Sequence, residues 1–350
     1  MTDLLSQAVL AEALLSPAVF GAALTRIEKI ETHVSFIFLA GEYVYKIKKA
    51  VDLGFLNFST LELRHFYCEE ELRLNRRYAP TLYLEVLPIT GTYSEPVLNG
   101  AGAVIEWAVK MRRFNERDRL DRMLANDRLE VRHIDALAQR IAGFHFTANI
   151  STQDDFGSLA AIAEPALANF APLRKVLRSA GDLSNLNKLQ AWTDQCLKNL
   201  CATFSARKIN GFIRECHGDL HLGNIALVEG VVTLFDCLEF SPALRWIDTI
   251  SEVAFVVMDL RHKGRIDLAR RFLNSYLEAS GDYAALAVLD FYCVYRALIR
   301  AKVACLRARQ EGIDAGKKNE LEAESRSYIR TAQQFTAHPV PALIITHGVS

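Results

Sequence analysis

The residues best suited to catalysis lie in two short segments of the chain's second half. The first, CHGDLHLGN, covers Cys216–Asn224 and has the form H-x-D-x-x-x-x-N, and the second, LFDCLEF, covers Leu234–Phe240. A carboxylate can orient an attacking hydroxyl and accept its proton, and hard oxygen ligands can hold Mg²⁺ against the phosphates of a nucleotide. Asp219 suits the first role, and Asn224 and Asp236 suit the second. The two segments therefore indicate phosphoryl transfer.

The chain between these segments should bring the two oxygen ligands together. Short apolar strands near 225–228 and 231–235 predict a hairpin that returns Asp236 to Asn224. Glu239 is expected to be an additional metal ligand, either directly or from outside the first set of ligands. An H-G-D tripeptide is common by chance, and a lone Asp or Asn in a loop is usually a turn residue. The joint pattern, on a loop before a hairpin, favours the catalytic interpretation.

A lysine in an apolar strand is the expected contact for the phosphates. The segment EYVYKIKK, Glu42–Lys49, resembles the third strand of a kinase small lobe, where an apolar run ends in a phosphate-binding lysine. Strand alternation puts Val44, Lys46 and Lys48 on one face. We expect Lys46 to enter the cleft, and Lys48 and Lys49 to be solvated. A strand-end lysine alone is more often a surface residue, so this assignment depends on the motif downstream.

Such a lysine needs a carboxylate partner to hold it in position. The helix expected over residues 60–78 offers three consecutive glutamates, Glu69–Glu71. They lie about 100° apart around the helix axis, so only one of them can face the cleft. Glu71, which directly precedes an apolar position, is expected to be the partner of Lys46, and the other two are expected to be solvated.

The first third of the chain combines short strands with one helix. The order strand, strand, strand, helix, strand, strand predicts an antiparallel sheet with one helix packed on a face, and the sequence beyond Arg113 is mainly helical. The predicted class is α+β, with a small five-stranded sheet lobe over 1–114, a larger helical lobe over 115–337 and a tail over 338–350. The expected elements are an N-terminal helix, strands near 27–31, 34–39, 43–48, 82–88 and 103–111, and helical regions 150–210 and 246–335 with loops at 154–157 and 180–187.

Composition excludes several classes of protein. Lys and Arg together number 41, as do Asp and Glu, and this zero net charge argues against a nucleic-acid partner. The seven cysteines are odd in number and lack paired spacing, which indicates free thiols in a reducing compartment. No apolar run has the length of a membrane span, and the N-terminal segment lacks the basic region of a signal peptide. We expect a cytoplasmic protein without membrane or nucleic-acid partners.

Together these residues resemble the aminoglycoside phosphotransferase family, part of the kinase-like superfamily that also contains choline and fructosamine kinases. The resemblance runs from about Ile27 to the helices beyond Met258, and HGDLHLGN and FDCLEF are its most specific parts. It implies a bilobal protein-kinase-like fold, ATP and Mg²⁺ as cofactors, and transfer of the γ-phosphate to a hydroxyl of a small molecule. By this likeness the base would be Asp219, the metal ligands Asn224 and Asp236, the phosphate-contacting lysine Lys46, and the adenine contact the backbone near Met111.

The sequence departs from the protein kinases in two respects. Between the first two predicted strands it has no glycine-rich loop, so the phosphates would be held by backbone amides and by the hydroxyls of Thr32 and Ser35. It also lacks D-F-G and A-P-E segments, which makes a protein substrate improbable. Asp248, in RWIDTISEVAF, is expected to brace the catalytic loop in a structural role.

A closer resemblance is to a bacterial subgroup in which this kinase-like domain is fused to a P-loop domain. Its recurring segments are matched here by Glu31–Leu39, Val44–Arg64, Glu71–Ile89 and Val256–Leu260. The final residues, HPVPALIITHGVS, read as an apolar strand running into Gly348, which is how a phosphate-binding G-x-x-x-x-G-K loop begins. This predicts a P-loop domain in cis in a longer version of the protein.

Two other functions remain open at this stage. The chain could be a nucleotide-binding regulatory module without turnover that controls a fused or partner P-loop domain. It could also be a metallohydrolase, because His217 and His221 are four apart, a spacing that binds zinc on a helix, although Gly218 is a poor helix residue and the glutamate of H-E-x-x-H is missing. The acceptor is not readable from the sequence, since one fold hosts many acceptors.

Overall fold

The computed structural model of the protein forms two compact units. The first comprises the residues up to Ser151 together with Arg214–Ile247, and the second comprises Thr152–Ile213 together with the residues from Asp248 onward. The structure describes residues 2–21, 24–54, 56–177, 179–309 and 312–337.

These units do not coincide with the lobes expected over 1–114 and 115–337. The first unit takes in the sheet and also the segments that follow it up to residue 151 and from residue 214 to 247. The division of the chain into two lobes at residue 114 stays a prediction. The tail expected over 338–350, with its apolar strand and Gly348, lies outside the described residues.

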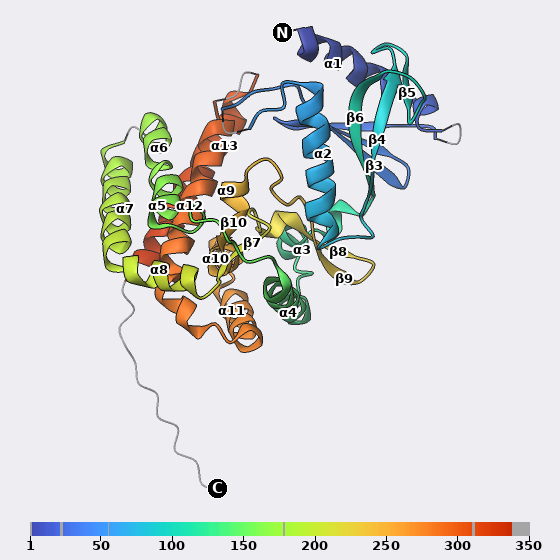
Figure 1. The fold of residues 1–350 in the computed structure, drawn as a ribbon. Helices are drawn as coiled ribbons and strands as arrows, with labels where there is room; N and C mark the ends of the chain where they lie inside the picture. The colour runs from blue at the N-terminus through green and yellow to red at the C-terminus, as the bar shows by residue number, and fades with distance from the viewer. Residues whose placement is uncertain (1, 22–23, 55, 178, 310–311, 338–350) are drawn as a thin grey trace. The chain divides into compact units, whose positions relative to one another are not determined.

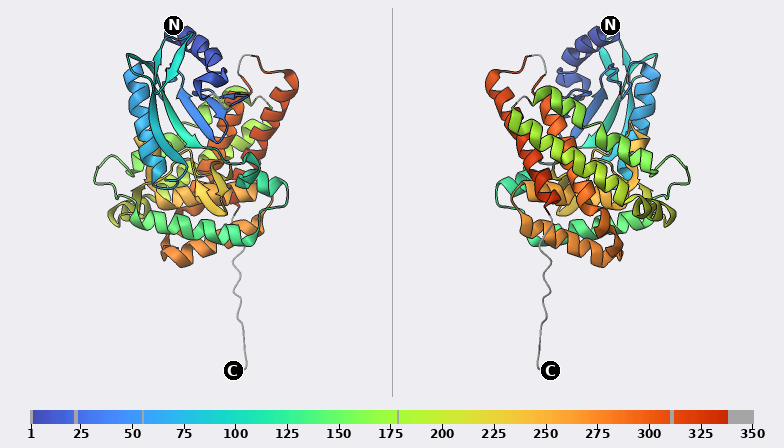
Figure 2. Two further views of the ribbon diagram at one scale, coloured as in Figure 1. Left: turned by 90° about the vertical axis from the view of Figure 1, so that its right-hand side faces the viewer. Right: turned by 90° about the vertical axis from the view of Figure 1, so that its left-hand side faces the viewer.

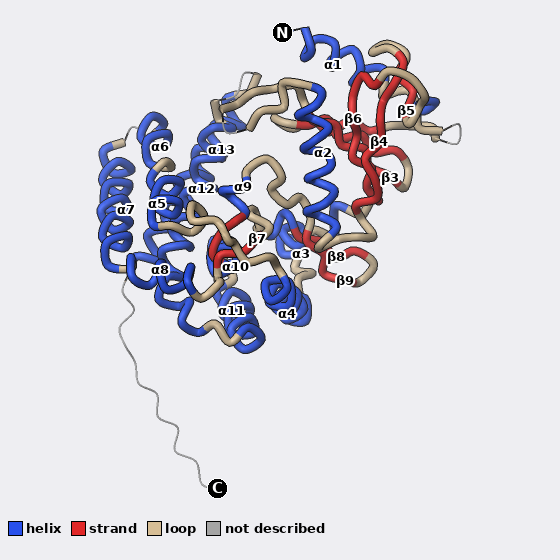
Figure 3. Tube along the Cα trace, in the orientation of Figure 1, coloured by secondary structure: helices blue, strands red, loops and turns tan. Residues whose placement is uncertain are grey.

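The first unit contains a six-stranded sheet in the order β1-β2-β3-β6-β4-β5, shown in Figure 3. Every neighbouring pair in it is antiparallel. Five strands match the predicted ones, whereas β5 was missed because it is a three-residue strand inside a turn-rich stretch. The strands are β1 (Glu28–Glu31), β2 (Ser35–Ala40), β3 (Tyr43–Lys48), β4 (Tyr83–Gly91), β5 (Pro96–Leu98) and β6 (Val104–Arg112).

Two helices lie against this sheet, α1 (Thr2–Ala13) and α2 (Leu61–Arg76), as Figures 1 and 2 show. α2 begins at the start of the helix expected over residues 60–78, because the Thr60 hydroxyl accepts a hydrogen bond from the Leu63 N–H at 3.2 Å and caps the helix. The helix packs against β4 and β6. It is the one helix that the sequence placed on a face of the sheet.

The alternation of side chains along β3 separates an apolar face from a charged one. Tyr45 and Ile47 belong to an apolar core cluster that also contains Leu10 of α1 and Phe38 of β2. Side chains at alternate strand positions point to opposite faces. Lys46 and Lys48 therefore turn toward α2, where their carboxylate partner lies.

The rest of the first unit includes a second hairpin, over residues 225–234. The two residues of its turn, Glu229 and Gly230, both have positive φ values, 50° and 81°, as a tight two-residue hairpin loop requires. The predicted hairpin is thus confirmed. The elements are η1 (Pro17–Val19), η2 (Glu116–Asp118), α3 (Leu120–Ala125), α4 (Val131–Thr147), β7 (Ile213–Glu215), η3 (Leu222–Asn224), β8 (Ile225–Val228), β9 (Val231–Leu234), α9 (Pro242–Arg245) and β10 (Trp246–Asp248), the chain passing between the units at β7 and β10.

The second unit is built from helices, as the sequence predicted. α10 packs against α11, α12 and α13, and α12 packs against α13. The loop expected at 180–187 is wrong, because the Ser179 hydroxyl accepts the Asp182 N–H at 3.0 Å and starts a helix there in spite of Gly181. The helices are α5 (Leu159–Leu167), α6 (Phe170–Val176), α7 (Ala180–Asn199), α8 (Cys201–Ile209), α10 (Thr249–His262), α11 (Ile266–Ser280), η4 (Tyr283–Ala285), α12 (Leu286–Arg307) and α13 (Ala315–Thr336).

Two expectations from composition concern the cysteines and membrane-spanning helices. All seven cysteines are free thiols. Among the described helices, none combines the length and the apolar character that crossing a bilayer would need.

A buried ionic network stabilises the second unit. Arg207 of α8 contacts Asp248 through Nε at 2.6 Å and Asp282 through Nη2 at 2.8 Å, and all three side chains are at most 4% exposed. Asp248 also caps α10 by accepting the Ile250 N–H at 3.1 Å. Asp248 is thus a helix cap and an ion-pair partner, and its expected role of bracing the loop at Asp219 stays a prediction.

We predict that Arg207→Met lowers the free energy of unfolding by about 3–5 kcal/mol, because it leaves two buried carboxylates without their counter-charge. Urea unfolding followed by circular dichroism measures this difference. Lys263→Met, at an exposed position after α10, is the matched control and should change stability by less than about 0.5 kcal/mol. Equal stability of Arg207→Met and the unsubstituted protein would show that the network adds nothing to this unit.

Candidate active site

The loop expected to be catalytic lies in the first unit, directly after β7. Gly218 has a φ of +90°, and a Cβ at this position would lie 2.8 Å from the Leu244 carbonyl oxygen. The backbone conformation and the close approach both require glycine here. The next residue, Asp219, has a side chain that is 34% exposed. Its carboxylate is accessible to a ligand.

His217 joins this loop to the segment that contains Asp236. Its ring is buried, and Nε2 lies 2.8 Å from the carbonyl oxygen of Phe235. Because a carbonyl oxygen can only accept, Nε2 bears the proton, and Nδ1 accepts from the Asp219 N–H at 3.4 Å. The His217 carbonyl in turn accepts the Leu238 N–H at 3.0 Å. One histidine thus fixes the spacing between two segments that contain predicted site residues.

Asn224 lies at the end of the same loop and contacts Asp219. Its Nδ2 donates to the Asp219 carbonyl at 2.9 Å and lies 3.3 Å from the carboxylate Oδ2. With the amide nitrogen directed at Asp219, Oδ1 is the atom that Asn224 can offer to a cation. After the β8–β9 hairpin, the Phe235 N–H returns to donate to the Asn224 carbonyl at 3.0 Å. The hairpin therefore returns the chain to Asn224, as expected.

Asp236 is held in an uncommon backbone conformation. Its φ is +63°, in the left-handed region, which costs a non-glycine residue roughly 1–2 kcal/mol although Asp and Asn adopt it more readily than most. Its N–H donates to the Tyr83 hydroxyl at 3.0 Å, and the Cys237 N–H donates to Oδ1 of the buried Asn75 at 2.9 Å. The N–H groups of Phe235 and Leu238 donate to backbone carbonyls. All four backbone N–H groups of residues 235–238 therefore have acceptors.

Lys46 points at two carboxylates. Its Nζ lies 2.8 Å from Glu71 Oε1 and 2.7 Å from Asp236 Oδ1. The Glu71 side chain is fully buried, whereas that of Asp236 is 48% exposed. The expected contact between Lys46 and Glu71 is present. Glu70, which was expected to be solvated, instead pairs with Arg73 at 2.8 Å.

These contacts determine whether Lys46, Glu71 and Asp236 are charged. Burial opposes the charge on Glu71, but Lys46 and Lys48 outweigh it and lower the pKa of this carboxyl. Partial desolvation by the surrounding protein also opposes the charge on Asp236, but Lys46 outweighs it and holds the pKa of Asp236 below its ordinary value. Burial works against the Lys46 ammonium as well, yet the two carboxylates raise the pKa of Lys46 well above its usual range. All three groups are therefore charged at neutral pH.

Lys48 is buried, so the expectation that it is solvated is wrong. Its side chain is 1% exposed, and Nζ lies 2.7 Å from Glu71 Oε2. The same Nζ contacts Glu239 Oε1. The physical reason is that Lys48 lies on the same strand face as Lys46, the face that α2 covers, and cannot reach solvent from there.

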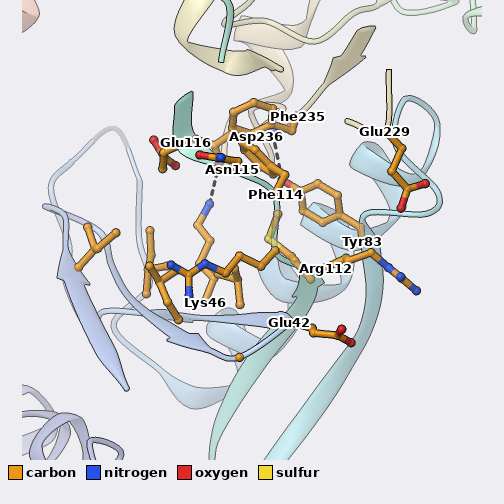
Figure 4. Close-up of a pocket in the computed structure, with 17 residues that line it drawn as sticks. Glu42, Lys46, Tyr83, Arg112, Phe114, Asn115, Glu116, Glu229, Phe235 and Asp236 are labelled. Atoms are coloured by element: carbon orange, nitrogen blue, oxygen red, sulfur yellow. Dashed lines mark hydrogen bonds and ion pairs between the residues drawn. The ribbon is translucent and has the colours of Figure 1, made fainter. Parts of the chain in front are cut away.

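A pocket of about 720 Å³ in the first unit opens beside Lys46 and Asp236. Figure 4 shows Lys46 reaching across it toward Asp236. The rings of Phe114 and Phe235 meet at its wall, with centroids 5.0 Å apart. Pockets of roughly 300–1,000 Å³ hold small-molecule ligands and cofactors. The apolar lining includes Ile37, Leu39, Val44 and Met111, and the polar lining includes Arg112, Asn115 and Glu116.

Of the two hydroxyls expected to help cradle the phosphates, that of Thr32 shapes the β1–β2 turn. The Thr32 Oγ1 donates to the Ser35 carbonyl at 3.1 Å and accepts the Ser35 N–H at 2.9 Å. The Ser35 side chain is 1% exposed. Their contact with a phosphate stays a prediction, and the geometry assigns Thr32 a local structural role.

The premise of the zinc alternative does not hold. Residues 217–221 are not helical, so His217 and His221 do not share a helix face. His217 Nε2 is bound to a backbone carbonyl, and His221 Nδ1 accepts the Gly223 N–H at 3.0 Å. The two rings brace the loop.

Two side chains that the sequence does not single out position Asp236. Tyr83 and Asn75 accept the backbone N–H groups of residues 236 and 237, from 153 and 162 residues away. Neither belongs to a motif, so no local signal identifies them. Alternation placed Lys48 on the same strand face as Lys46, but its burial depends on contacts with Glu71 and Glu239 from other segments.

A cluster of arginines ties α2 to the strand before the loop that contains Asp219. Glu215 of β7 is 3% exposed and contacts Arg73 at 2.8 Å, Arg77 at 3.0 Å and Arg245 at 3.2 Å. Burial works against its charge, but the three arginines lower the pKa of Glu215. The helix that contains Glu71 is thereby attached to the loop that contains Asp219.

We predict that Glu215→Gln destabilises the protein by about 1–3 kcal/mol at pH 7 and weakens the dependence of stability on pH in acid. A carboxyl whose folded pKa is depressed stabilises above its unfolded pKa of about 4.3, and this stabilisation is lost as the pH falls through the folded value. Urea unfolding at a series of pH values from 7 to 3 tests this. Glu95→Gln, at an exposed position, is the control; parallel curves for Glu215→Gln and this control would contradict the prediction.

Comparison with known proteins gives distant relatives and a shared fold. No family model matches the chain. An uncharacterized protein of Mycobacterium tuberculosis (strain ATCC 25618 / H37Rv) is 35% identical over 329 residues, which are 91% of this chain and 61% of that protein. An uncharacterized protein of Mycobacterium bovis matches to the same extent. The chain thus spans about three fifths of the length of the curated relatives it matches.

Two solved structures resemble the chain over almost its whole length. An amicoumacin kinase in complex with AMP-PNP, Ca²⁺ and Ami has a TM-score of 0.53 at 12% identity and covers 93% of both chains. A choline/ethanolamine kinase family protein from Mesorhizobium loti has a TM-score of 0.51 at 12% identity, covering 93% of this chain and 98% of that one. These comparisons do not support the P-loop domain expected in cis. The chain has the kinase-like fold of these two proteins, α+β with a curled antiparallel sheet and a larger helical part, as its resemblance to the aminoglycoside phosphotransferases implied.

Proposed function

We propose that this protein is an ATP-dependent phosphotransferase of the aminoglycoside phosphotransferase type, which moves the γ-phosphate of ATP to a hydroxyl of a small molecule. The observation on which this rests is the chain of contacts from Asp236 through Lys46 to Glu71, drawn from segments up to 190 residues apart. It lies at a pocket of nucleotide-binding size. The fold is that of two kinases, one of them in complex with AMP-PNP and Ca²⁺.

The adenine would bind among the apolar residues of the pocket, near the end of β6. The Arg112 N–H donates to the Leu82 carbonyl at 2.8 Å, and the Arg113 N–H donates to the Glu42 carbonyl at 2.7 Å. Those two amides are occupied within the protein. The backbone that meets the polar edge of the base therefore lies just beyond the expected Met111, at Phe114 and the residue after it.

The donors available for a cation suit Mg²⁺. Asp236 offers a half-exposed carboxylate, and Asn224 offers a carboxamide oxygen. Hard oxygen ligands of this kind, completed by phosphate oxygens and water, are those that Mg²⁺ prefers. The metal would neutralise charge that develops on the phosphates during transfer. Lys46 would turn from Asp236 to the phosphates when the nucleotide binds, with Glu71 behind it.

Asp219 would act as the base. The carboxylate is accessible, and the loop around it is fixed by Gly218, His217 and Asn224. It would orient the acceptor hydroxyl and take its proton as the oxygen–phosphorus bond forms and the bond to ADP breaks.

We predict that Asp219→Asn reduces phosphoryl transfer by 10²–10⁴-fold, roughly the loss expected for a general base, while the affinity for AMP-PNP stays within about twofold. ATP consumption with a panel of sugars, amino alcohols and aminoglycosides measures the first quantity, and calorimetric titration measures the second. Asp127→Asn, the same substitution at an exposed position, is the control. Turnover by Asp219→Asn within about tenfold of the unsubstituted protein would show that Asp219 is not the base. If no variant consumes ATP in response to an acceptor, the alternative of a nucleotide-binding module without turnover is favoured.

We further predict that Asp236→Asn removes the Mg²⁺-dependent gain in AMP-PNP affinity and that Lys46→Ala weakens binding by roughly 10–100-fold, since charge-assisted hydrogen bonds contribute about 1.5–3 kcal/mol. Asparagine is chosen at position 236 because it tolerates the left-handed backbone, whereas alanine would add strain. Titrations with and without Mg²⁺ measure both effects. Unchanged titrations in the two variants would place the nucleotide elsewhere.

A further inference from the structure

A second lysine lies behind the one proposed to meet the phosphates. Lys48 is two positions beyond Lys46 on β3, and its side chain is 1% exposed. Its ammonium lies 4.9 Å from the centroid of the Phe58 ring and contacts two carboxylates, those of Glu71 and Glu239. A buried lysine is costly unless it is paired. Nothing in the proposed phosphotransfer explains why the protein keeps one here.

The contacts of Glu71 are divided between the two lysines. Its Oε1 lies 2.8 Å from Lys46 Nζ, and its Oε2 lies 2.7 Å from Lys48 Nζ. Each oxygen of the buried carboxylate therefore has its own ammonium. The carboxylate cannot rotate away from Lys46 without breaking the contact with Lys48.

Glu239 completes the arrangement on the far side. Its Oε1 contacts Lys48, and its backbone carbonyl accepts from Arg245 Nη1 at 2.9 Å. Arg245 is itself buried and contacts Glu215 at 3.2 Å. Five groups thus alternate in charge from the pocket inward: Asp236, Lys46, Glu71, Lys48 and Glu239.

Nucleotide binding would change the contacts of Lys46, at the pocket end of this series, but not those of Lys48 at the inner end. In the structure Lys46 is shared between Asp236 and Glu71. If Lys46 turns to the phosphates, Glu71 shares one of its two counter-charges with the ligand and depends on the other, Lys48, to remain in place. Lys48 is the only other ammonium that contacts Glu71 among the described residues.

We propose that Lys48 and Glu239 are positioning residues, which hold Glu71 so that its Oε1 keeps Lys46 aimed at the phosphates. This inference rests on the proposed function. It gives Glu239 a role different from the metal ligand expected from the sequence, since its carboxylate oxygen faces an ammonium within the protein. The two roles make different predictions for the same variants.

A double-mutant cycle between the two lysines tests the proposal. The affinity for AMP-PNP with Mg²⁺ is measured by calorimetry for the unsubstituted protein, Lys46→Ala, Lys48→Met and the double variant, with urea unfolding in parallel. We expect Lys48→Met to weaken binding about tenfold when Lys46 is present, and by less than twofold when Lys46 is alanine, because Lys48 acts through Lys46. Lys49→Met, at the next position and paired with Glu31 at 2.6 Å, is the matched control and should bind normally.

Lys48→Met leaves two buried carboxylates and could fail to fold, so Lys48→Met/Glu239→Gln is the second variant. It removes one positive and one negative charge and keeps the net charge of the series. We expect this variant to fold, to bind AMP-PNP about tenfold more weakly than the unsubstituted protein, and to keep the Mg²⁺-dependent gain in affinity.

The outcomes separate the inference from the function on which it rests. An equal loss from Lys48→Met in both Lys46 backgrounds would overturn the positioning role and leave the phosphotransferase intact. Loss of the Mg²⁺-dependent gain in Lys48→Met/Glu239→Gln, or in Glu239→Gln alone, would overturn it in favour of metal ligation by Glu239. Normal AMP-PNP binding by Lys46→Ala would instead overturn the proposed function, and this inference with it.

Discussion

The buried carboxylate of Glu71 is the group around which the candidate site is organised. A carboxylate with no exposure stays ionised only if counter-charges replace its hydration, and two lysines on alternate positions of β3 supply them. The same lysines reach Asp236 and Glu239. One pair of ammonium groups therefore links the helix α2, the strand β3 and the segment after the second hairpin.

The segment at Asp236 is held by its backbone as well as by its charge. Four successive N–H groups find acceptors, two of them on the side chains of Tyr83 and Asn75. These bonds hold Asp236 in a left-handed conformation that the residue would not prefer alone. Strain of this kind persists where surrounding contacts over-determine the backbone, which is frequent at functional sites. The carboxylate is thus placed before any ligand arrives.

The fold and the candidate site give different information about this protein. The likeness to two kinases describes how sheet and helices are arranged, and many acceptors are served by one such arrangement. The site is where this chain departs from the protein kinases, with a β1–β2 turn closed by Thr32 where they have a glycine-rich loop. A second buried lysine behind the first is a further feature of this chain.

The sequence by itself determined the parts of this protein that local spacing encodes. Local patterns that act over a few residues, such as periodicity, turn residues and caps, predict five of the six strands of the sheet, the hairpin after Asn224 and the helix after Thr60. The choice of Glu71 as the partner of Lys46 rests on the same kind of spacing. The H-x-D-x-x-x-x-N motif also identified candidate site residues. Their chemical roles are proposals.

Only the tertiary structure decided the contacts that join distant segments. The acceptors of the Asp236 and Cys237 amides lie 153 and 162 residues away in the chain. Lys48 looked like a solvated lysine because its burial depends on a helix that covers the strand and on a carboxylate at position 239. Whether a charged side chain meets water or a counter-charge is settled by what packs over it, and no pattern within β3 contains that information.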